Sequence, residues 1–397
     1  MKETIAIIGG GSSALMLASE IDTSKYDVTI FEKNPTIGRK LLVAGNGGFN
    51  LTHSEELEDL KSKFVANKTI LNTLDYFTNT DLRDWLSNIG IETFIGSSKR
   101  IFPVKPIKPI HVLDKIKQKI EDNNVSIKTN HEWKGFSENN DLIFESNDKE
   151  FTEKFDKVVF ALGGKSWKKT GSDGSWTSIL EGKGIEIIDF LPSNCHYEIT
   201  WKEKFAKKHQ GEPLKNIRLT CGNNSKKGEV VITRYGMEGG AIYALSPQIR
   251  EYLLKEEGSA PIVLDLKPTV KLDSMIRKLK NPRKRKSWSD HVIWQLKLSP
   301  VAFALLKRSM DKEDFNELET LANRVKNIPL TVTNFGPIDE AISTVGGVSL
   351  DEITENFELK KVPNHYVIGE MLDWDAPTGG YLLQGCFSMG KFLAGKI

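Results

Sequence analysis

The chain has few cysteines and no long apolar run, and each shortage excludes a class of protein. Its 397 residues include only Cys195, Cys221 and Cys386, with no Cys-x-x-Cys pair. Neither a disulfide framework nor a flavin-plus-dithiol reductase is therefore indicated. No run approaches the roughly 20 apolar residues of a membrane span, and the short apolar start is broken by glycines, unlike a signal peptide. We expect a soluble, cytoplasmic protein without membrane contact.

An excess of charge of one sign is also missing. The 55 Lys and Arg balance 53 Asp and Glu, for a net charge of +2, so no nucleic-acid partner is expected from overall charge. The seven histidines show no metal-ligand spacing, and we expect no metal. What remains is an ordinary globular composition with 39% hydrophobic residues. Its length suits two or three domains and a large buried cofactor.

The stretch "IAIIGGGSSALMLASEI", residues 5 to 21, is typical of a strand, a turn and a helix. Gly9, Gly11 and Ala14 fit G-x-G-x-x-G/A. The first glycine permits the tight turn, the second lets the backbone approach a pyrophosphate, and the small third residue allows close packing. Residues 14 to 21 then predict a helix whose N-terminus faces the phosphates, and Ser12 and Ser13 before it are further expected cofactor contacts. An ordinary glycine turn is the alternative.

A second expected strand, residues 28 to 31, ends at Glu32, which Lys33 follows. At this spacing from Gly9 a carboxylate can accept hydrogen bonds from a ribose diol, so an unphosphorylated adenosine ribose is favoured over a 2′-phosphate. The alternative is a solvated charge at a strand end. The combination of both features in one βαβ unit favours a dinucleotide.

The segment after Glu32 favours FAD over NAD. A glycine-rich, polar loop directly after the ribose carboxylate suits a longer ligand, because a flavin ring needs close backbone approach and amide hydrogen bonds. A surface loop with Gly and Asn as turn formers is the alternative. The residues expected to contact the cofactor here are Arg39, Lys40, Gly45, Asn46, Gly47 and Asn50.

Five segments together carry a family resemblance. They are the first turn, "GRKLLVAGNGGFNLTH", "FALGGKSWKKTGSDG", "STVGGVSLDEI" and "YVIGEMLDWDAPTGGYLLQGCFSMG". The chain resembles bacterial FAD-binding flavoproteins of the aminoacetone oxidase family, also labelled NAD(P)/FAD-dependent oxidoreductases. At "RYGMEGGAIYALS" many relatives have a His-x-Gly-Leu-Ser-Gly-Pro type sequence, so the chain resembles a divergent subgroup.

The resemblance implies an α/β fold with a discontinuous, Rossmann-like two-dinucleotide-binding FAD domain. A β-rich domain that itself carries a helical subdomain interrupts it. With the β-rich alternation that starts near residue 191, we expect the FAD domain over 1–190 and 351–397, the inserted β-rich domain over 191–268 and 331–350, and the helical insert over 269–330. Residues 124 to 160 alternate like short antiparallel strands.

The resemblance also implies cofactor contacts along the rest of the chain, although packing of small residues is an alternative at several of them. Backbone at Trp133 would contact the adenine, and Ala161 with its glycines the adenylate. Glu370, where a strand is expected to end, would bind the ribityl chain, a role that Asp373 could share or take. The last helix, expected to start after Pro377 with Thr378 as N-cap, would face the flavin. The residues are Trp133, Ala161, Gly163, Gly164, Gly369, Glu370, Asp373, Gly379, Gly380, Tyr381 and Leu382.

The expected chemistry is that of non-covalent FAD, with protein groups orienting a substrate and moving a proton. No second G-x-G-x-x-G on a strand and helix is present, so NAD(P)H would act as a transient reductant. The weak catalytic candidates are Arg100, Arg234, Tyr235 and Glu238. We expect an oxidoreductase that oxidises an amine or reduces an activated double bond in a small organic substrate.

Two other readings stay open. The first is a flavin-binding protein with an RNA-related or regulatory role, which would use the basic patch over residues 277–286. The second is a group-transfer or tRNA-modifying flavoenzyme. A solvated helix end and loop is the favoured explanation of the basic patch, because no aromatic stacking platform or binding motif accompanies it. The sequence does not indicate an oligomeric state.

Overall fold

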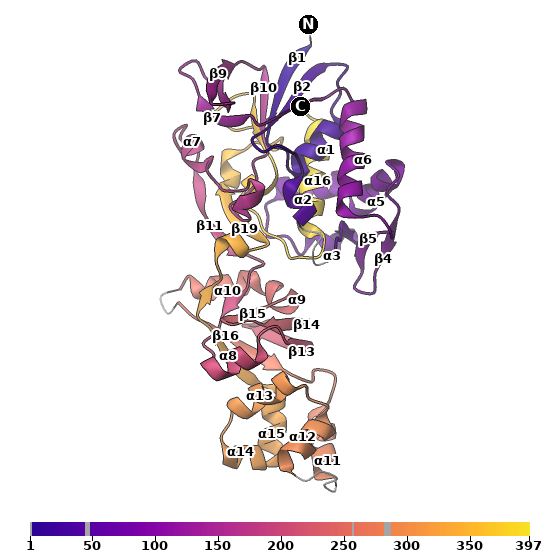
Figure 1. Cartoon of the computed structure of the whole chain (residues 1–397), viewed down its shortest axis with the longest axis vertical. Helices are drawn as coiled ribbons and strands as arrows, with labels where there is room; N and C mark the ends of the chain where they lie inside the picture. The colour runs from indigo at the N-terminus through magenta and orange to yellow at the C-terminus, as the bar shows by residue number, and fades with distance from the viewer. Residues whose placement is uncertain (1, 44–47, 256–257, 282–286) are drawn as a thin grey trace. The chain divides into compact units, whose positions relative to one another are not determined.

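The computed structural model describes residues 2–43, 48–255, 258–281 and 287–397. They form two compact units, Met1–Pro192 with Ile338–Ile397, and Ser193–Pro337 (Figure 1). The expected loop residues Gly45, Asn46 and Gly47, and residues 283–286 of the basic patch, lie outside the described residues. Within the described ranges, no helix is both long and apolar enough to cross a membrane.

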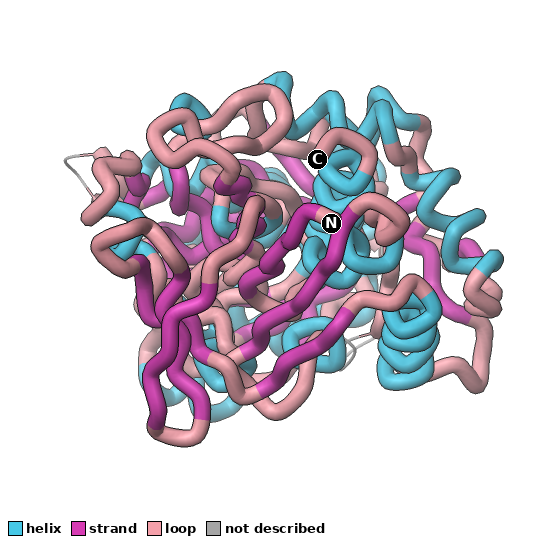
Figure 2. Tube along the Cα trace, turned by 90° about the horizontal axis from the view of Figure 1, so that it is seen from above, coloured by secondary structure: helices cyan, strands magenta, loops and turns pink. Residues whose placement is uncertain are grey.

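A five-stranded parallel sheet forms the centre of the first unit, and Figure 2 draws the strands of the chain in magenta. Ile5 to Ile8 of its middle strand are buried, which is typical of parallel strands covered on both faces. The strand order is β20 (His365–Val367), β10 (Lys157–Phe160), β1 (Glu3–Ile8), β2 (Tyr26–Glu32) and β6 (Ser126–Thr129). The expected Rossmann-like α/β fold is confirmed.

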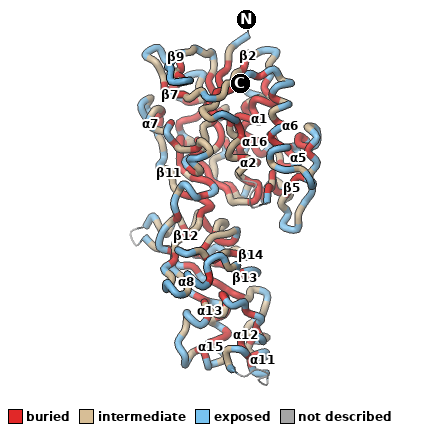
Figure 3. Tube along the Cα trace, in the orientation of Figure 1, coloured by how far each residue is buried: buried red, intermediate tan, exposed pale blue. Residues whose placement is uncertain are grey.

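Helix α1 (Ser12–Glu20) packs on this sheet, and α6 (Pro109–Asp122) and α16 (Tyr381–Ala394) pack on α1. Almost all of α1 is buried, and it is red in Figure 3. The last helix crosses the first at Gly390, where an added Cβ would run into the backbone oxygen of Ser13. A glycine therefore lets the two ends of the chain pack backbone to backbone.

Smaller elements complete the first unit. A β3–β5–β4 sheet and a β7–β8–β9 sheet are antiparallel, and β11 pairs with β19. Their bounds are β3 (Thr52–His53), β4 (Thr93–Ile95), β5 (Arg100–Pro103), β7 (Glu132–Phe136), β8 (Leu142–Ser146), β9 (Lys149–Glu153), β11 (Ile187–Ser193) and β19 (Ser343–Val348). The remaining helices are α2 (Arg39–Val43), α3 (Leu57–Lys61), α4 (Lys68–Tyr76), α5 (Asn79–Asn88) and α7 (Thr177–Glu181).

The second unit is built on a seven-stranded sheet whose strand pairs are antiparallel. The order is β17 (Ile328–Val332), β16 (Ala260–Asp265), β13 (Pro213–Cys221), β14 (Asn224–Ile232), β15 (Gly236–Glu238), β12 (Tyr197–Glu198) and β18 (Asn334–Phe335). Its helices are α8 (Glu203–His209), α9 (Gly240–Tyr243), α10 (Ser246–Leu253), α11 (Leu272–Lys280), α12 (Trp288–Leu296), α13 (Pro300–Arg308), α14 (Lys312–Asn316) and α15 (Leu318–Lys326).

The two compact units do not have the expected boundaries. The first unit runs to Pro192 rather than to residue 190, and the expected β-rich domain and helical insert form one unit. The chain returns to the first unit at Ile338 rather than after residue 350, because β19 pairs with β11 there. Residues 124 to 160 also differ from the expected antiparallel series. The middle of that segment is antiparallel, but its two ends, β6 and β10, are parallel strands of the central sheet.

The contact of α16 with α1 predicts that replacing Gly390 by alanine destabilises the fold. Although Ala favours a helix over Gly, we expect Gly390→Ala to lower the free energy of unfolding by about 1–3 kcal/mol, since its Cβ would meet the α1 backbone. Thermal unfolding followed by circular dichroism measures this. Gly395→Ala on the same helix is the control, because its Cβ would meet the movable hydroxyl end of exposed Tyr76. Equal stability of both variants would contradict the packing.

Candidate functional site

The predicted cofactor segments follow the carboxyl ends of adjacent parallel strands. Ile8 of β1 lies in register with Phe31 of β2 and Phe160 of β10, and Phe160 lies in register with Val367 of β20. The first glycine turn, Glu32, Ala161 and Gly369 therefore begin along one edge of the sheet. Ligands of open α/β sheets bind at this edge.

The first turn leaves open space beside Gly11, its third glycine. Gly9 has φ +100°, and a Cβ there would lie 2.6 Å from the Ala161 carbonyl oxygen, so only glycine fits. A Cβ at Gly11 would meet only that same oxygen, at 3.6 Å, among the described residues. The backbone of Gly11 is thus open to a ligand, as a pyrophosphate contact requires.

The N-terminus of α1 is also uncapped. Gly11 is its N-cap, so no side chain accepts the first N–H groups, and the first turn carries no acidic residue. The N–H groups of the first turn have no intrahelical acceptor, and the helix dipole adds a partial positive charge. Ser12, Ser13 and Ala14 occupy this turn, so the helix starts two residues before the expected start at Ala14. Their predicted contact with a phosphate stays a prediction.

Glu32 holds the turn itself. One carboxylate oxygen accepts a hydrogen bond from the Gly10 N–H at 2.9 Å, and the other accepts from both the backbone N–H and the side-chain amide of Asn34, at 2.8 and 2.6 Å. The oxygen that accepts from Gly10 can accept one more hydrogen bond, so it can still take a ribose hydroxyl, whereas the other oxygen already has two donors. Lys33 pairs with Asp173 at 2.7 Å. Sequence reasoning missed Gly10 as the donor that orients Glu32.

The turn after β10 is equally tight. Gly163 has φ +75°, its carbonyl oxygen accepts a hydrogen bond from the Trp176 indole at 3.0 Å, and a Cβ at Gly164 would overlap the Thr344 hydroxyl. Trp133 lies on β7, and its buried ring packs on Phe160 with centroids 4.7 Å apart. The predicted backbone contact of Trp133 with an adenine stays a prediction.

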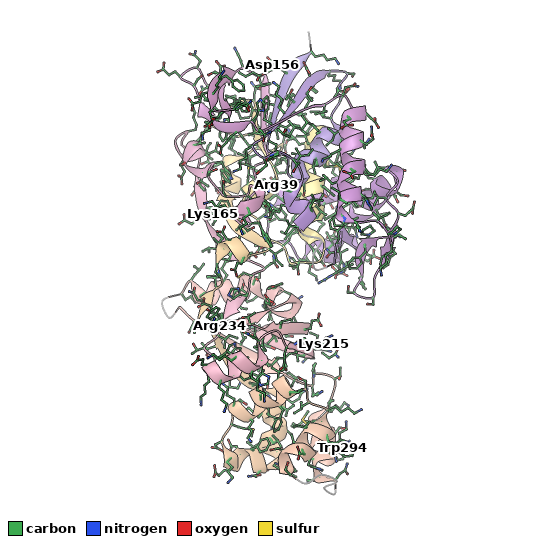
Figure 4. The ribbon with its side chains drawn as sticks, viewed as in Figure 1. Arg39, Asp156, Lys165, Lys215, Arg234 and Trp294 are labelled. Atoms are coloured by element: carbon green, nitrogen blue, oxygen red, sulfur yellow. The ribbon has the colours of Figure 1, made fainter. Side chains whose placement is uncertain are left out.

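Two basic residues of α2 reach the same edge. Lys40 Nζ lies 2.8 Å from a Glu370 carboxylate oxygen and 3.0 Å from the Ser166 hydroxyl. Arg39, labelled in Figure 4, donates to the Lys169 carbonyl at 3.1 Å. Its Nε is buried and finds no hydrogen-bond partner among the described residues. Because buried donors are nearly always satisfied, this orphan donor fits a polar ligand group.

Gly369 and Asp373 have structural partners at this edge. Gly369 has φ +80°, and a Cβ there would lie 2.5 Å from the Ser13 hydroxyl at the head of α1. Asp373 accepts a hydrogen bond from the Gly346 N–H at 3.0 Å. Glu370 is the first acidic residue after β20. Its predicted contact with a ribityl chain stays a prediction.

The last helix starts later than expected. Its N-cap is Gly380, not Thr378, and the first helical residue is Tyr381, followed by half-buried Leu382. Gly379 and Gly380 have φ +120° and +102°, which is not helical, and Gly380 packs on the Thr52 backbone. Asn50 lies beside Gly380, where its side-chain oxygen can accept the Gly380 N–H. The helix therefore presents an uncapped N-terminus.

The weak catalytic candidates lie in both units. Arg100 belongs to the first unit, on β5 beside Gly379. In the second unit, the Arg234 guanidinium lies 5.4 Å from the ring centroid of exposed Tyr235. Glu238 ends β15, and burial together with this carboxylate raises the pKa of Tyr243 to about 12. Catalytic roles for Arg234, Tyr235 and Glu238 stay predictions.

All three cysteines are buried and free. Burial raises the pKa of the Cys195 and Cys221 thiols to about 11, and that of Cys386 to about 12. At neutral pH they are thiols rather than reactive thiolates. The chemistry of the site must therefore come from other groups.

Comparison with known proteins gives full-length matches. A family model described as "HI0933-like protein Rossmann domain" matches residues 3–397. The 3-dehydro-bile acid delta(4,6)-reductase of Clostridium scindens is 26% identical over 412 aligned positions, which cover 99% of this chain and 98% of the relative. The ribosomal RNA dihydrouridine synthase of Haemophilus influenzae is 24% identical, covering 96% and 95%.

Solved structures of similar fold include two steroid dehydrogenases. The 3-ketosteroid-delta4-(5alpha)-dehydrogenase from Rhodococcus jostii RHA1 gives a TM-score of 0.52 at 12% identity, covering 99% of this chain and 97% of the other. The 3-ketosteroid delta1-dehydrogenase from Sterolibacterium denitrificans gives 0.50 at 12% identity, covering 100% of both. At this identity the similarity concerns the fold.

The open space at Gly11 predicts a variant that separates cofactor binding from folding. Gly11→Ala should leave the unfolding of the apo chain unchanged but weaken FAD binding at least about tenfold, or about 1.4 kcal/mol, because the methyl group would occupy the phosphate position. Titration of flavin fluorescence measures the Kd. Gly9→Ala is the contrast and should lower stability even without FAD, because its Cβ would meet Ala161. An unchanged Kd for Gly11→Ala would contradict the assigned site.

Proposed function

Because the chain belongs to the HI0933-like family and is a flavoprotein oxidoreductase, we propose that it reduces a carbon–carbon double bond conjugated to a carbonyl group, with FAD as cofactor. The substrate is a small organic molecule. This is one of the two reactions that the sequence suggested. The other, amine oxidation of the aminoacetone oxidase type, stays a prediction that the assay below also tests.

The observation that carries the proposal is the full-length similarity to a reductase of conjugated double bonds. A delta(4,6) diene of a 3-dehydro bile acid is conjugated to the 3-oxo group, as the name of the relative implies. Formation of dihydrouridine likewise saturates a ring double bond that is conjugated to a carbonyl. The two relatives thus share one bond type although their substrates differ in size. Conservation of that reaction in this chain is the simplest explanation.

The residues at the sheet edge fit FAD. When bound, FAD supplies the hydride. The uncapped N-terminus of α1 and the Gly11 backbone would bind the diphosphate, and Glu32 the adenosine ribose. Lys40 and Glu370 would bind the ribityl region, and Arg39 Nε would find an acceptor in the cofactor. The N-terminus of α16 would lie near the flavin ring and favour negative charge there. A reduced nicotinamide nucleotide is the proposed transient electron donor.

The two half-reactions test this function. The FAD-loaded protein is reduced anaerobically with NADPH or, if that fails, with dithionite, and then mixed with 2-cyclohexen-1-one or a 3-oxo-delta4 steroid. We expect the oxidised flavin spectrum to return together with the saturated ketone. Aminoacetone added to the oxidised protein is the comparison. Bleaching by the amine, without reoxidation by either enone, would contradict the proposal and favour amine oxidation.

A second candidate is reduction of a pyrimidine ring within RNA, favoured by the division of charge between the units. Residues 193–337 hold 26 of the 55 Lys and Arg but only 16 of the 53 Asp and Glu, whereas the rest of the chain is acidic. An excess of ten positive charges on one unit is typical of a surface that meets a polyanion. The near-neutral total conceals this division.

Salt-dependent RNA binding tests the second candidate. Lys215 and Lys227 are exposed on β13 and β14 of the second unit, and Figure 4 labels Lys215. If this sheet binds RNA, their joint replacement by Gln should lower the slope of log K against log salt by about 0.7 to 0.9 per lost phosphate contact. Lys154→Gln in the first unit is the control. Absence of salt-dependent binding by the unchanged protein would exclude this candidate.

A further inference from the structure

Four polar side chains meet at the N-terminus of α16, three of them brought from elsewhere in the first unit. The Tyr381 hydroxyl donates to a Glu55 carboxylate oxygen at 2.8 Å. The His53 ring stacks on that of Tyr381, with centroids 5.1 Å apart and 21° between planes, and its Nδ1 lies 3.8 Å from the same Glu55 oxygen. Arg100 on β5 lies opposite His53 on β3 in the register of these two antiparallel strands.

The position of Arg100 is the least expected feature of this cluster. A Cβ on Gly379 would lie 3.2 Å from Arg100 Nε, so the guanidinium borders the turn that opens α16. Its side chain makes no hydrogen bond or ion pair with another described residue. A cation near a helix N-terminus is unfavourable, because both carry positive charge. An electron-rich oxygen between them would be attracted by both.

The protonation states suit a proton donor. Burial, reinforced by the hydrogen bond to Glu55, raises the pKa of Tyr381, while Arg100 acts in the opposite direction. The phenol therefore keeps its proton at neutral pH. Burial lowers the pKa of His53. The positive charges of Arg100 and Lys99 lower it further, whereas the Glu55 carboxylate raises it. His53 is thus a neutral ring, and the mobile proton of the cluster resides on Tyr381.

We propose that Tyr381 protonates the substrate carbon next to the carbonyl, that Glu55 passes a replacement proton from water to Tyr381, and that Arg100 binds the carbonyl oxygen. The proposal rests on the proposed function. It requires the Tyr381 hydroxyl to turn from Glu55 toward the substrate when the substrate is bound. The partly exposed Glu55 side chain, 19% accessible, can exchange protons with water.

The step balances as a conjugate reduction. Hydride adds to the far carbon of the double bond, and the π electrons move to the carbonyl oxygen, whose negative charge Arg100 stabilises. The enolate then takes the Tyr381 proton on the near carbon, which gives the saturated ketone and a phenolate. A phenol is a far stronger acid than the C–H bond that forms, so the transfer is downhill. Water restores the phenol through Glu55, and a reduced nicotinamide nucleotide restores the hydride.

The kinetic test compares two tyrosines of the first unit. Tyr381→Phe removes the proton but keeps the ring against His53, and Tyr366→Phe on β20, also buried, is the control. Reduction of the bound flavin by NADPH or dithionite should be unchanged in both. Reoxidation by 2-cyclohexen-1-one should slow at least about 100-fold in Tyr381→Phe alone. Equal reoxidation of both variants would overturn the inference while leaving the proposed function intact.

A titration without cofactor or substrate provides a second readout. The ultraviolet difference between the unchanged apo protein and Tyr381→Phe reports the ionisation of this one phenol. We expect the pKa of Tyr381 to lie above the ordinary range of a tyrosine. In Glu55→Gln the phenol should ionise at a lower pH, because the negative charge of the carboxylate is gone. An ordinary pKa for Tyr381 that does not change in Glu55→Gln would contradict the proposed coupling of these two residues.

Glu55→Gln also carries the kinetic test if Tyr381→Phe fails to load FAD. Its reoxidation by the enone should then slow, with normal flavin reduction, and an unchanged rate would overturn the relay. If the unchanged protein, loaded and reduced, fails to react with any enone, the proposed function falls and this inference falls with it. That result is distinct from a Tyr381→Phe variant that reacts as fast as the unchanged protein.

Discussion

The site depends on the parallel pairing of β1 with β2 and β10, and of β10 with β20. Parallel strands all end at one edge, so segments that are hundreds of residues apart in sequence begin side by side. The register places the Gly9 turn between Glu32 and Ala161, and the backbone hydrogen bonds of Gly9 to Phe31 and of Ala161 to Ile8, each 2.8 Å, fix that order. Without this strand pairing the glycine turn and Glu32 would not lie at the same edge of the sheet, where one ligand can contact both.

The contact between the first and last helices adds the second half of the site. Gly390 allows α16 to approach the α1 backbone, and this places Gly379 and Gly380 against Thr52 of β3. The ion pair of Lys391 with Glu20 joins the same two helices farther along. Two uncapped helix N-termini thus belong to the first unit, and in the proposed function one would bind the diphosphate while the other would lie near the flavin ring.

Local patterns predicted those parts of the chain whose structure depends on nearby residues. The β-branched run of Ile5 to Ile8, the glycine spacing and the strand ending at Glu32 indicated a dinucleotide turn, and the α/β fold class is confirmed. The start of α16 was wrong, because Gly380 must accommodate the Thr52 backbone, which no local signal shows. Strands β6 and β10 looked antiparallel, since alternation does not reveal the partner of a strand.

The sequence by itself determined the class of fold, the glycine turn and the position of Glu32 at the end of the second strand, because each follows from patterns within one βαβ unit. Only the tertiary structure decided that Arg39 has an orphan donor, that Lys40 pairs with Glu370, and that Glu55, His53, Arg100 and Tyr381 meet. Those residues come from α2, from β3 and the residues after it, from β5, from the turn after β20 and from α16. Their proximity depends on how the helices pack against the sheet, and packing across such separations leaves no periodic pattern in the chain.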